Sequence, residues 1–184
     1  MSYGILIVVA GTMFAGKSET IIKSISEQNI LGYSVKQPIV FKHAWDKTRY
    51  DGQYIVSHNH NQTPCQLLDD DGLKSLQAKA KDCDWVFIDE VQFFNKEQLL
   101  NCCHALLKSG INICCAGLNQ DCFGKPFGAM GELLALADHI ITICSKCSTC
   151  GAPATKTKRL TEDTATVLVG GSAIYEPRCR THWL

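Results

Sequence analysis

The feature that most restricts the fold of this chain is a glycine-rich segment, residues 11–18, that satisfies the pattern G-x4-G-K-S. It follows a continuous apolar run, residues 4–10, typical of a buried parallel strand, and it precedes a helical pattern. In that context the loop is expected to curl so that its backbone N–H groups point at phosphate oxygens. The alternative is a chance match to the pattern in a strand–helix turn. Lys17 is expected to reach the β- and γ-phosphates of a nucleotide, and Ser18 to offer its hydroxyl to Mg²⁺. The other loop residues expected to hold the nucleotide are Gly11, Met13, Phe14, Ala15 and Gly16.

A second apolar run, residues 86–88, ends in the two carboxylates Asp89 and Glu90. In an open parallel sheet, ligands bind beyond the carboxyl ends of the strands, so both groups are expected near the phosphates. They could organise Mg²⁺ or accept a proton from an attacking hydroxyl or water, and a solvated acidic turn is the alternative. Gln92 and Phe93 follow at the same edge, where Phe93 is a candidate for lining a base pocket.

Apolar runs alternate with helical patterns over most of the chain, which predicts an α/β fold with a mostly parallel sheet. Residues 44–64 are polar and are expected to form a long loop. From residue 144 onward, cysteine pairs and Thr/Lys-rich stretches replace the helices, with one strand-like run at 166–169. We therefore expect a nucleotide-binding α/β domain over residues 1–143 and a small β-type unit over residues 144–184. The expected strands are 4–10, 38–41, 85–88, 111–116 and 140–143, and the expected helices follow Ser18 and span 73–80, 96–109 and 128–137.

The C-terminal unit carries two short pairs of soft metal ligands, Cys147 with Cys150 and Cys179 with His182. Four such ligands are what Zn²⁺ takes in a closed structural site, so a catalytic zinc is not expected. Cys144 forms an alternative pair with Cys147, and the spacing does not exclude it. A disulfide or free thiols are the other interpretation of these residues.

Composition limits the classes of partner. The chain has 18 basic and 18 acidic residues, so no overall field favours nucleic acid or an anionic membrane. Its first apolar run is too short to span a bilayer and lacks a preceding basic region, so a cytoplasmic location is expected. Most of its 11 cysteines lie in apolar runs and are expected to be reduced core residues.

Taken in order, these segments resemble the zinc-containing thymidine kinases of cells and bacteria, over nearly the whole chain. Besides the phosphate loop and the zinc pairs, the matching blocks are residues 87–94, 117–118, 125–128, 157–159 and 170–175. The resemblance implies a RecA-like P-loop domain with a zinc-bearing lasso domain. It also implies a homotetramer that uses ATP and Mg²⁺ to phosphorylate thymidine, and deoxyuridine as well, at the 5′-hydroxyl, with thymidine triphosphate as feedback inhibitor.

The same resemblance implies roles for individual residues. Glu90 would be the general base that takes the proton of the 5′-hydroxyl. Tyr175 would lie over the nucleoside from the lasso. Asp89 and Gln92 are expected beside the nucleotide. The remaining residues expected around the thymine are Met13, Phe93, Leu118, Phe127 and Thr157.

Two stretches depart from the family pattern. The motif Asp-x-Arg-[Tyr/Phe] has one extra residue here, between Asp46 and Arg49, which are still expected to serve magnesium and phosphate. The phenylalanine expected four residues before Pro126 is Cys122, and Phe123 is therefore expected to enter the base pocket from a shifted position.

Other functions compete with kinase activity. The sequence of residues 89–92 resembles the acidic box of a nucleic-acid translocase, but the chain has no basic excess for a strand-binding surface. A zinc adaptor without enzymatic activity would leave the phosphate loop and Glu90 without a task. His58 and His60 are alternative acid–base residues, although phosphoryl transfer depends mainly on positioning and charge neutralisation.

Overall fold

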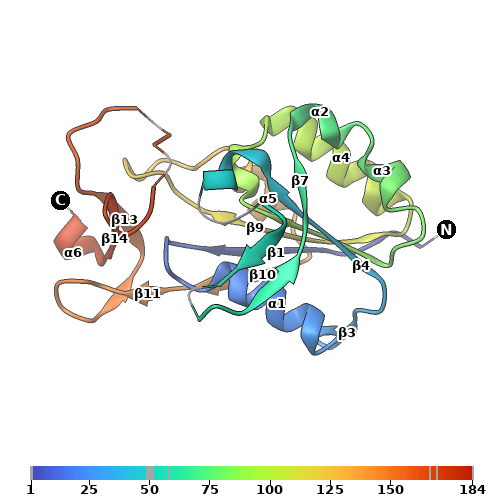
Figure 1. Ribbon diagram of the computed structural model, residues 1–184, viewed down its shortest axis with the longest axis horizontal. Coiled ribbons are helices and arrows are strands. Elements are labelled where there is room, and N and C mark those ends of the chain that lie inside the picture. The colour runs from blue at the N-terminus through green and yellow to red at the C-terminus, as the bar shows by residue number, and fades with distance from the viewer. Residues whose placement is uncertain (1, 49–51, 58, 166, 169, 184) are drawn as a thin grey trace.

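A six-stranded parallel sheet forms the centre of the molecule (Figure 1). The computed structural model describes residues 2–48, 52–57, 59–165, 167–168 and 170–183. Neighbouring strands are parallel throughout the sheet. In spatial order the strands are β10 (His139–Ile143), β1 (Leu6–Gly11), β9 (Asn112–Leu118), β8 (Trp85–Asp89), β4 (Pro38–His43) and β7 (Gln66–Leu68). The predicted α/β fold is confirmed.

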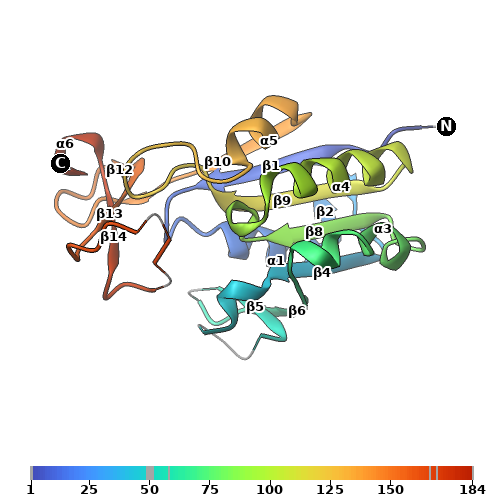
Figure 2. The same ribbon diagram turned by 90° about the horizontal axis from the view of Figure 1, so that it is seen from above.

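Side chains alternate between two apolar cores along the central strands. In β1, Leu6 and Val8 enter one core, while Ile7 and Val9 enter the other. Helices cover both faces of the sheet, which explains why β1 is apolar throughout (Figure 2). One face carries α2 (Asp70–Leu73), α3 (Leu76–Lys79), α4 (Lys96–Lys108) and α5 (Met130–Leu136), and the other carries α1 (Lys17–Ser26) with the hairpin β2 (Asn29–Ile30) and β3 (Tyr33–Ser34).

Three local predictions differ from the structure. The single helix expected over 73–80 is two short helices, α2 and α3. The expected loop 44–64 contains a 3-10 helix, η1 (Ala44–Thr48), and the hairpin of β5 (Tyr54–Val56) and β6 (Gln62–Pro64). Within the expected strand 166–169, Val167 and Leu168 are not in a strand, and the other two residues lie outside the described part of the chain.

The C-terminal residues form a small unit at the end of the sheet toward which the parallel strands run (Figure 1). It contains two two-stranded sheets, β11 (Ser145–Lys146) with β12 (Pro153–Ala154), and β13 (Lys156–Arg159) with β14 (Tyr175–Arg178). The short helix α6 (Arg180–Trp183) follows. Because parallel sheets bind ligands at this end, the unit stands beside the expected binding site. None of the described helices is both long and apolar enough to cross a membrane.

Candidate active site

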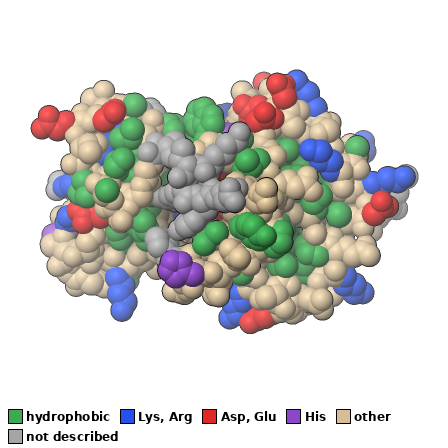
Figure 3. Space-filling view, viewed as in Figure 1, with side chains coloured by type: hydrophobic (Ala, Val, Ile, Leu, Met, Phe, Trp, Pro, Cys, Tyr) green, Lys and Arg blue, Asp and Glu red, His purple; other side chains and the backbone are tan. Residues whose placement is uncertain are grey.

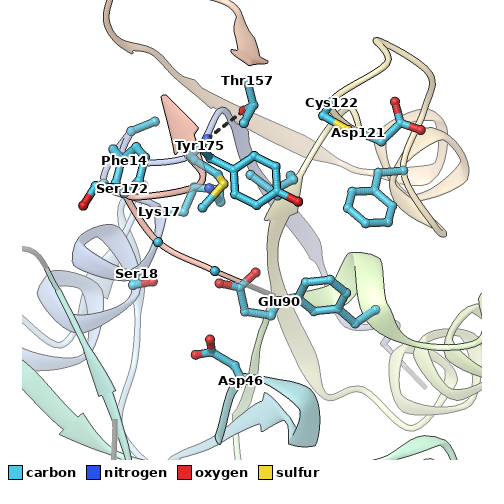
Figure 4. A pocket seen from close by; sticks show the side chains of 18 of the residues that line it. Phe14, Lys17, Ser18, Asp46, Glu90, Asp121, Cys122, Thr157, Ser172 and Tyr175 are labelled. Atoms are coloured by element: carbon cyan, nitrogen blue, oxygen red, sulfur yellow. Dashed lines mark hydrogen bonds between the residues drawn. The ribbon is translucent and has the colours of Figure 1, made fainter. Parts of the chain in front are cut away.

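A cavity of about 600 Å³ lies at the carboxyl ends of the strands, between the glycine-rich loop and the C-terminal unit (Figure 4). The structure brings most of the predicted site residues to it. The predicted residues that line it are Met13, Phe14, Ala15, Gly16, Lys17, Ser18, Asp46, Glu90, Phe93, Leu118, Phe127, Thr157 and Tyr175.

The loop before α1 holds an irregular backbone at the base of this cavity. Phe14 and Gly16 both have positive φ, 63° and 93°. Lys17 is buried, and its Nζ donates to the carbonyl oxygen of Thr12 over 2.9 Å. Gly11 does not line the cavity: a Cβ there would lie 2.3 Å from the carbonyl oxygen of Ile143, so close strand packing requires this glycine.

Ser18 and the buried Asp89 form an oxygen pair next to the loop. The Ser18 hydroxyl donates to Asp89 Oδ2 over 2.8 Å, and Asp89 is only 2% exposed. Burial, and then the neighbouring Glu90 charge, raise the pKa of Asp89 to about 7, although the Ser18 hydrogen bond and Lys17 act in the opposite direction. Neighbouring groups do not fully compensate the charge of the Asp89 carboxylate. A carboxylate of this kind beside a hydroxyl is a set of oxygen ligands that suits Mg²⁺.

Glu90 directs its carboxylate into the cavity from the turn after β8 (Figure 4). Its backbone is left-handed, with φ 57° and ψ 39°, a conformation that is uncommon for a residue with a side chain. The 3-10 helix η2 (Val91–Phe93) follows at once. Gln92 is buried behind Glu90 and donates from Nε2 to Glu90 Oε2 over 2.5 Å. Gln92 therefore supports Glu90 and does not itself line the cavity.

Apolar side chains, with the hydroxyls of Thr157 and Tyr175, form another wall of the cavity. The rings of Phe93 and Phe127 meet edge to face at 5.8 Å. Thr157 accepts a 3.3 Å hydrogen bond at Oγ1 from the Met13 backbone N–H. The ring of Tyr175 extends over the cavity from β14 (Figure 4).

Phe123 is not part of this wall. It is 47% exposed, and its ring lies 5.7 Å from the guanidinium carbon of Arg159. Cys122 lines the cavity in its place. The one-residue shift in the sequence thus places a thiol, and not a ring, at this part of the wall.

The stretch after β4 contributes Asp46, whose carboxylate is held by a buried lysine. Lys42 is 1% exposed, and its Nζ lies 3.4 Å from Asp46 Oδ2 and donates to the Tyr54 carbonyl oxygen over 3.1 Å. Arg49 and His58 lie outside the described residues. His60 is exposed on the turn between β5 and β6 and does not line the cavity.

Sequence reasoning did not nominate several residues that line the cavity. Glu19 follows the phosphate loop and accepts at Oε1 a 2.9 Å hydrogen bond from Asn61, which ties α1 to the β5–β6 hairpin. Gly170 and Gly171 belong to the block 170–175, in which the sequence predicts a site role for Tyr175 alone. Ser172 belongs to the same block. Val56 is in β5, and the remaining residues lie on several separate segments that share no recognisable pattern. The residues missed are Glu19, Val56, Ser57, Asn59, Gln120, Asp121, Cys122, Val167, Leu168, Gly170, Gly171 and Ser172.

The four predicted metal ligands lie together in the C-terminal unit. The ligand atoms of Cys147, Cys150, Cys179 and His182 are all within 4.8 Å of one another. Cys150 Sγ and Cys179 Sγ are 3.8 Å apart, and a tetrahedral site with Zn–S bonds of 2.3 Å requires about 3.8 Å. Burial raises the pKa of the Cys147 thiol, but backbone N–H groups outweigh it and lower the pKa to about 5, which favours the thiolate that a metal needs. The exposed Cys144 is outside this group.

Charges on the surface are mixed. On the face shown in Figure 3, basic and acidic side chains are interspersed over the described residues, without a continuous basic patch. This distribution agrees with the zero net charge of the chain.

The chain is similar to known proteins over nearly its whole length. The family described as Thymidine kinase matches residues 4–183. A thymidine kinase of Coprothermobacter proteolyticus is 40% identical over 185 residues, which cover 97% of this chain and 90% of that protein. A thymidine kinase of Pyrobaculum aerophilum is 34% identical over 189 residues, which cover 97% and 98%. Among solved structures, the cytoplasmic domain of the Type VII Secretion ATPase EccC of Thermomonospora curvata covers 78% of this chain and 20% of its own, with a TM-score of 0.44 and 13% identity, too distant to inform function.

Proposed function

This chain belongs to the thymidine kinase family and is a thymidine kinase; on that premise we propose that it transfers the γ-phosphoryl group of ATP to the 5′-hydroxyl of thymidine inside the cavity at the strand ends. The observation that carries the proposal is that Lys17 and the Glu90 carboxylate face the same cavity. Lys17 would bind the phosphates of the donor, and Glu90 would contact the hydroxyl of the acceptor.

The glycine-rich loop is the donor side of the proposed site. Its backbone N–H groups and the Lys17 ammonium would hold the triphosphate. The paired oxygens of Ser18 and Asp89 would hold Mg²⁺, which when bound neutralises charge that builds up on the phosphates. Asp46 also lines the cavity and is a second carboxylate for the proposed ion.

Glu90 is the proposed general base. As the 5′-oxygen attacks the γ-phosphorus, its proton passes to the Glu90 carboxylate, the bond to the bridging oxygen breaks and ADP leaves. The Gln92 amide fixes Glu90 Oε2, so the other carboxylate oxygen is oriented for the acceptor. Removal of this proton at the moment of attack is the contribution that a carboxylate can make to a transfer otherwise governed by positioning.

The apolar wall is the acceptor side. The rings of Phe93, Phe127 and Tyr175 together with Met13 and Leu118 suit a flat pyrimidine base, and Thr157 offers a polar group at its edge. Deoxyuridine differs from thymidine by one methyl group, and an apolar pocket discriminates only weakly against a missing methyl. We therefore propose that both nucleosides are accepted.

The C-terminal ligand group is proposed to hold a structural zinc ion. Three thiols and one imidazole at tetrahedral spacing fit it, and zinc when bound would stabilise residues 144–184 as a domain separate from residues 1–143. A homotetramer, feedback inhibition by thymidine triphosphate and a cytoplasmic location complete the proposal, supported by the family relationship alone.

The experiment that tests the proposal is a nucleoside panel with labelled ATP and Mg²⁺, repeated with competing thymidine triphosphate. We expect labelled thymidine monophosphate, product from deoxyuridine, and less product when the triphosphate is present. Release of phosphate only with single-stranded DNA would instead support a translocase. Transfer to another nucleoside but not to thymidine would contradict the proposed acceptor.

A further inference from the structure

The C-terminal helix α6 contacts the wall of the cavity through one side chain that no predicted role uses. Trp183 is the last residue of α6 and follows His182, one of the four candidate metal ligands. Its indole is partly buried between β13 and the loop that joins Leu118 to Phe127. The strand β13 and this loop both contribute residues to the cavity, so the position of the indole affects the position of both segments.

Trp183 first contacts the strand that carries Thr157. Its Nε1–H donates to the Thr157 carbonyl oxygen over 3.3 Å, and the Thr157 hydroxyl in turn accepts from the Met13 N–H. Thr157 and Met13 both line the cavity. One chain of hydrogen bonds therefore runs from α6 through the apolar wall to the glycine-rich loop.

Trp183 also contacts the loop on the other side of the wall. A Cβ on Gly124 would lie 2.7 Å from its Cη2, and Gly124 has φ 80°, so both the backbone and the indole require glycine here. The Lys156 Nζ lies 4.8 Å from the centre of the Trp183 ring and donates to Gln120 Oε1 over 2.6 Å. Lys156 is itself buried, which fixes the ammonium between the two partners.

The contacted loop is stiff, so a displacement at Gly124 reaches the cavity. The Asp121 carboxylate accepts at Oδ1 from the backbone N–H groups of Phe123 and Lys125, both at 2.9 Å. The Asp121 and Gly124 backbones also bond across the turn. Gln120, Asp121 and Cys122, which lie on the same turn, face the cavity. Asp121 and Cys122 lie on the side of the cavity away from Lys17 and Ser18 (Figure 4), where the base of the acceptor would lie.

We propose that Trp183 is a positioning residue for the nucleoside side of the site. It joins α6, which the four-ligand group anchors, to both halves of the base-binding wall. Among the described hydrogen bonds, it reaches the phosphate loop only through Thr157 and the Met13 N–H, and not through Lys17 or Ser18. The inference rests on the proposed placement of thymidine in the cavity. It predicts that loss of the indole weakens thymidine binding selectively, because small displacements of positioning groups have large effects on bound geometry.

The test compares Trp183→Ala and Trp183→Phe with Arg180→Ala, a change at an exposed residue of the same helix. Calorimetric affinity for thymidine and for a non-hydrolysable ATP analogue, KM for each substrate, and zinc content are measured for each variant. For Trp183→Ala we expect thymidine affinity to fall about tenfold, with ATP affinity and kcat within about twofold and zinc content unchanged. Trp183→Phe keeps an aromatic ring but lacks both the N–H and the distal indole atoms that face Gly124, so it should lie between Trp183→Ala and the wild type.

Several results would overturn the inference. These are unchanged thymidine affinity in Trp183→Ala, an equal loss for both substrates, loss of zinc, or the same loss in Arg180→Ala. If Trp183→Ala does not fold, Lys156→Met provides the second test, because it removes the ammonium between Trp183 and Gln120 and leaves α6 intact; an effect on ATP alone, or none, contradicts the inference. Failure of the wild type to bind thymidine would instead reject the proposed acceptor.

Discussion

The side-chain amide of Gln92 bridges Glu90 and the backbone of Leu118: Nε2 donates to Glu90 Oε2 over 2.5 Å, and Oε1 accepts from the Leu118 N–H over 3.0 Å. Because Gln92 is buried, the bridge fixes the end of β9 relative to the turn after β8. The proposed base and a residue of the proposed thymine pocket are thereby held by one amide. We expect the position of the carboxylate to matter as much as its charge.

Glu90→Gln should lower kcat by at least about a hundredfold, because an amide cannot take the proton of the 5′-hydroxyl. Binding of ATP should change little, since Glu90 is not in the phosphate loop. Steady-state kinetics and nucleotide titration measure the two effects. Glu97→Gln, a change of the same kind at an exposed helix position, is the control. Near-normal turnover of Glu90→Gln would reject its role as base.

Asp89→Asn should raise the Mg²⁺ concentration needed for half-maximal activity, because an amide oxygen carries no full negative charge for the ion. Ser18→Ala should act in the same direction, since it removes the paired hydroxyl. Activity measured against Mg²⁺ at fixed ATP gives the shift. Asp71→Asn is the control, because that carboxylate is exposed and pairs with Lys74. A Mg²⁺ dependence identical to that of the wild type would argue against this metal position.

Two phenylalanines four residues apart should respond differently to truncation. Phe127→Ala removes a ring that contacts Phe93 in the cavity, so we expect KM for thymidine to rise about tenfold. Phe123→Ala should leave KM within about twofold, because exposed substitutions change free energies by about 0.5 kcal/mol or less. Initial-rate measurements over a range of thymidine concentrations test the pair. A larger effect at Phe123 would place its ring in the base pocket after all.

Cys179→Ala should remove zinc and lower the melting temperature, because the C-terminal unit would lose the ion that joins its two ligand pairs. Cys144→Ala should retain about one zinc per chain, since Cys144 stands outside the ligand group. Elemental analysis and thermal unfolding of both variants are the measurements. Zinc loss from Cys144→Ala would make Cys144 a ligand in place of one of the four assigned residues. A wild-type protein without metal would reject the zinc site.

Stability should fall as the pH drops below about 6.5, the ordinary pKa of histidine. Burial lowers the pKa of His43 in the folded state, although the charges of Asp70, Asp69 and Glu90 raise it in part. The unfolded chain therefore binds a proton that the folded chain resists, and the stability associated with neutral His43 is present above this pH and is lost below it. Urea unfolding at several pH values between 5 and 8 gives the free energy of unfolding. Its dependence on pH should be weaker for His43→Gln than for the wild type.

The exposed His104 provides the comparison for that series. His104→Gln should leave the pH dependence of unfolding unchanged, because this side chain is exposed and its replacement disturbs no buried group. If both variants, or neither, alter the pH dependence of the unfolding free energy, a group other than His43 governs it.

The parts of the structure that the sequence predicted are those in which local pattern and tertiary environment agree. The strand β1 is apolar throughout because both faces of the sheet are covered, and the phosphate loop and metal pairs have fixed spacings. The sixth strand, β7, was missed because it is three residues long, begins with a polar Gln66 and lies at the sheet edge. The β5–β6 hairpin was missed for a similar reason: each strand has only three residues, and β6 is polar, so tertiary contacts determine the pairing.

The cavity shows the same division. Residues on the loop and strand motifs were nominated, whereas Asp121 and Cys122 face the cavity only because the turn after β9 folds against the C-terminal unit. Either Cys122 or Phe123 could face the cavity, because the two residues are adjacent. Composition does not determine which of the two side chains does so. The contact of Phe123 with Arg159, on a distant strand, has no signature in the sequence.

The left-handed backbone at Glu90 has an evolutionary consequence. A side chain in that region costs roughly 1–2 kcal/mol that glycine would not incur, so selection for folding alone would favour glycine at this position. Such a replacement would yield an abundant, well-folded protein without its carboxylate. Persistence of glutamate there in a lineage would thus record demand for turnover, and its loss would be an early sign that a descendant had kept the scaffold and abandoned the chemistry.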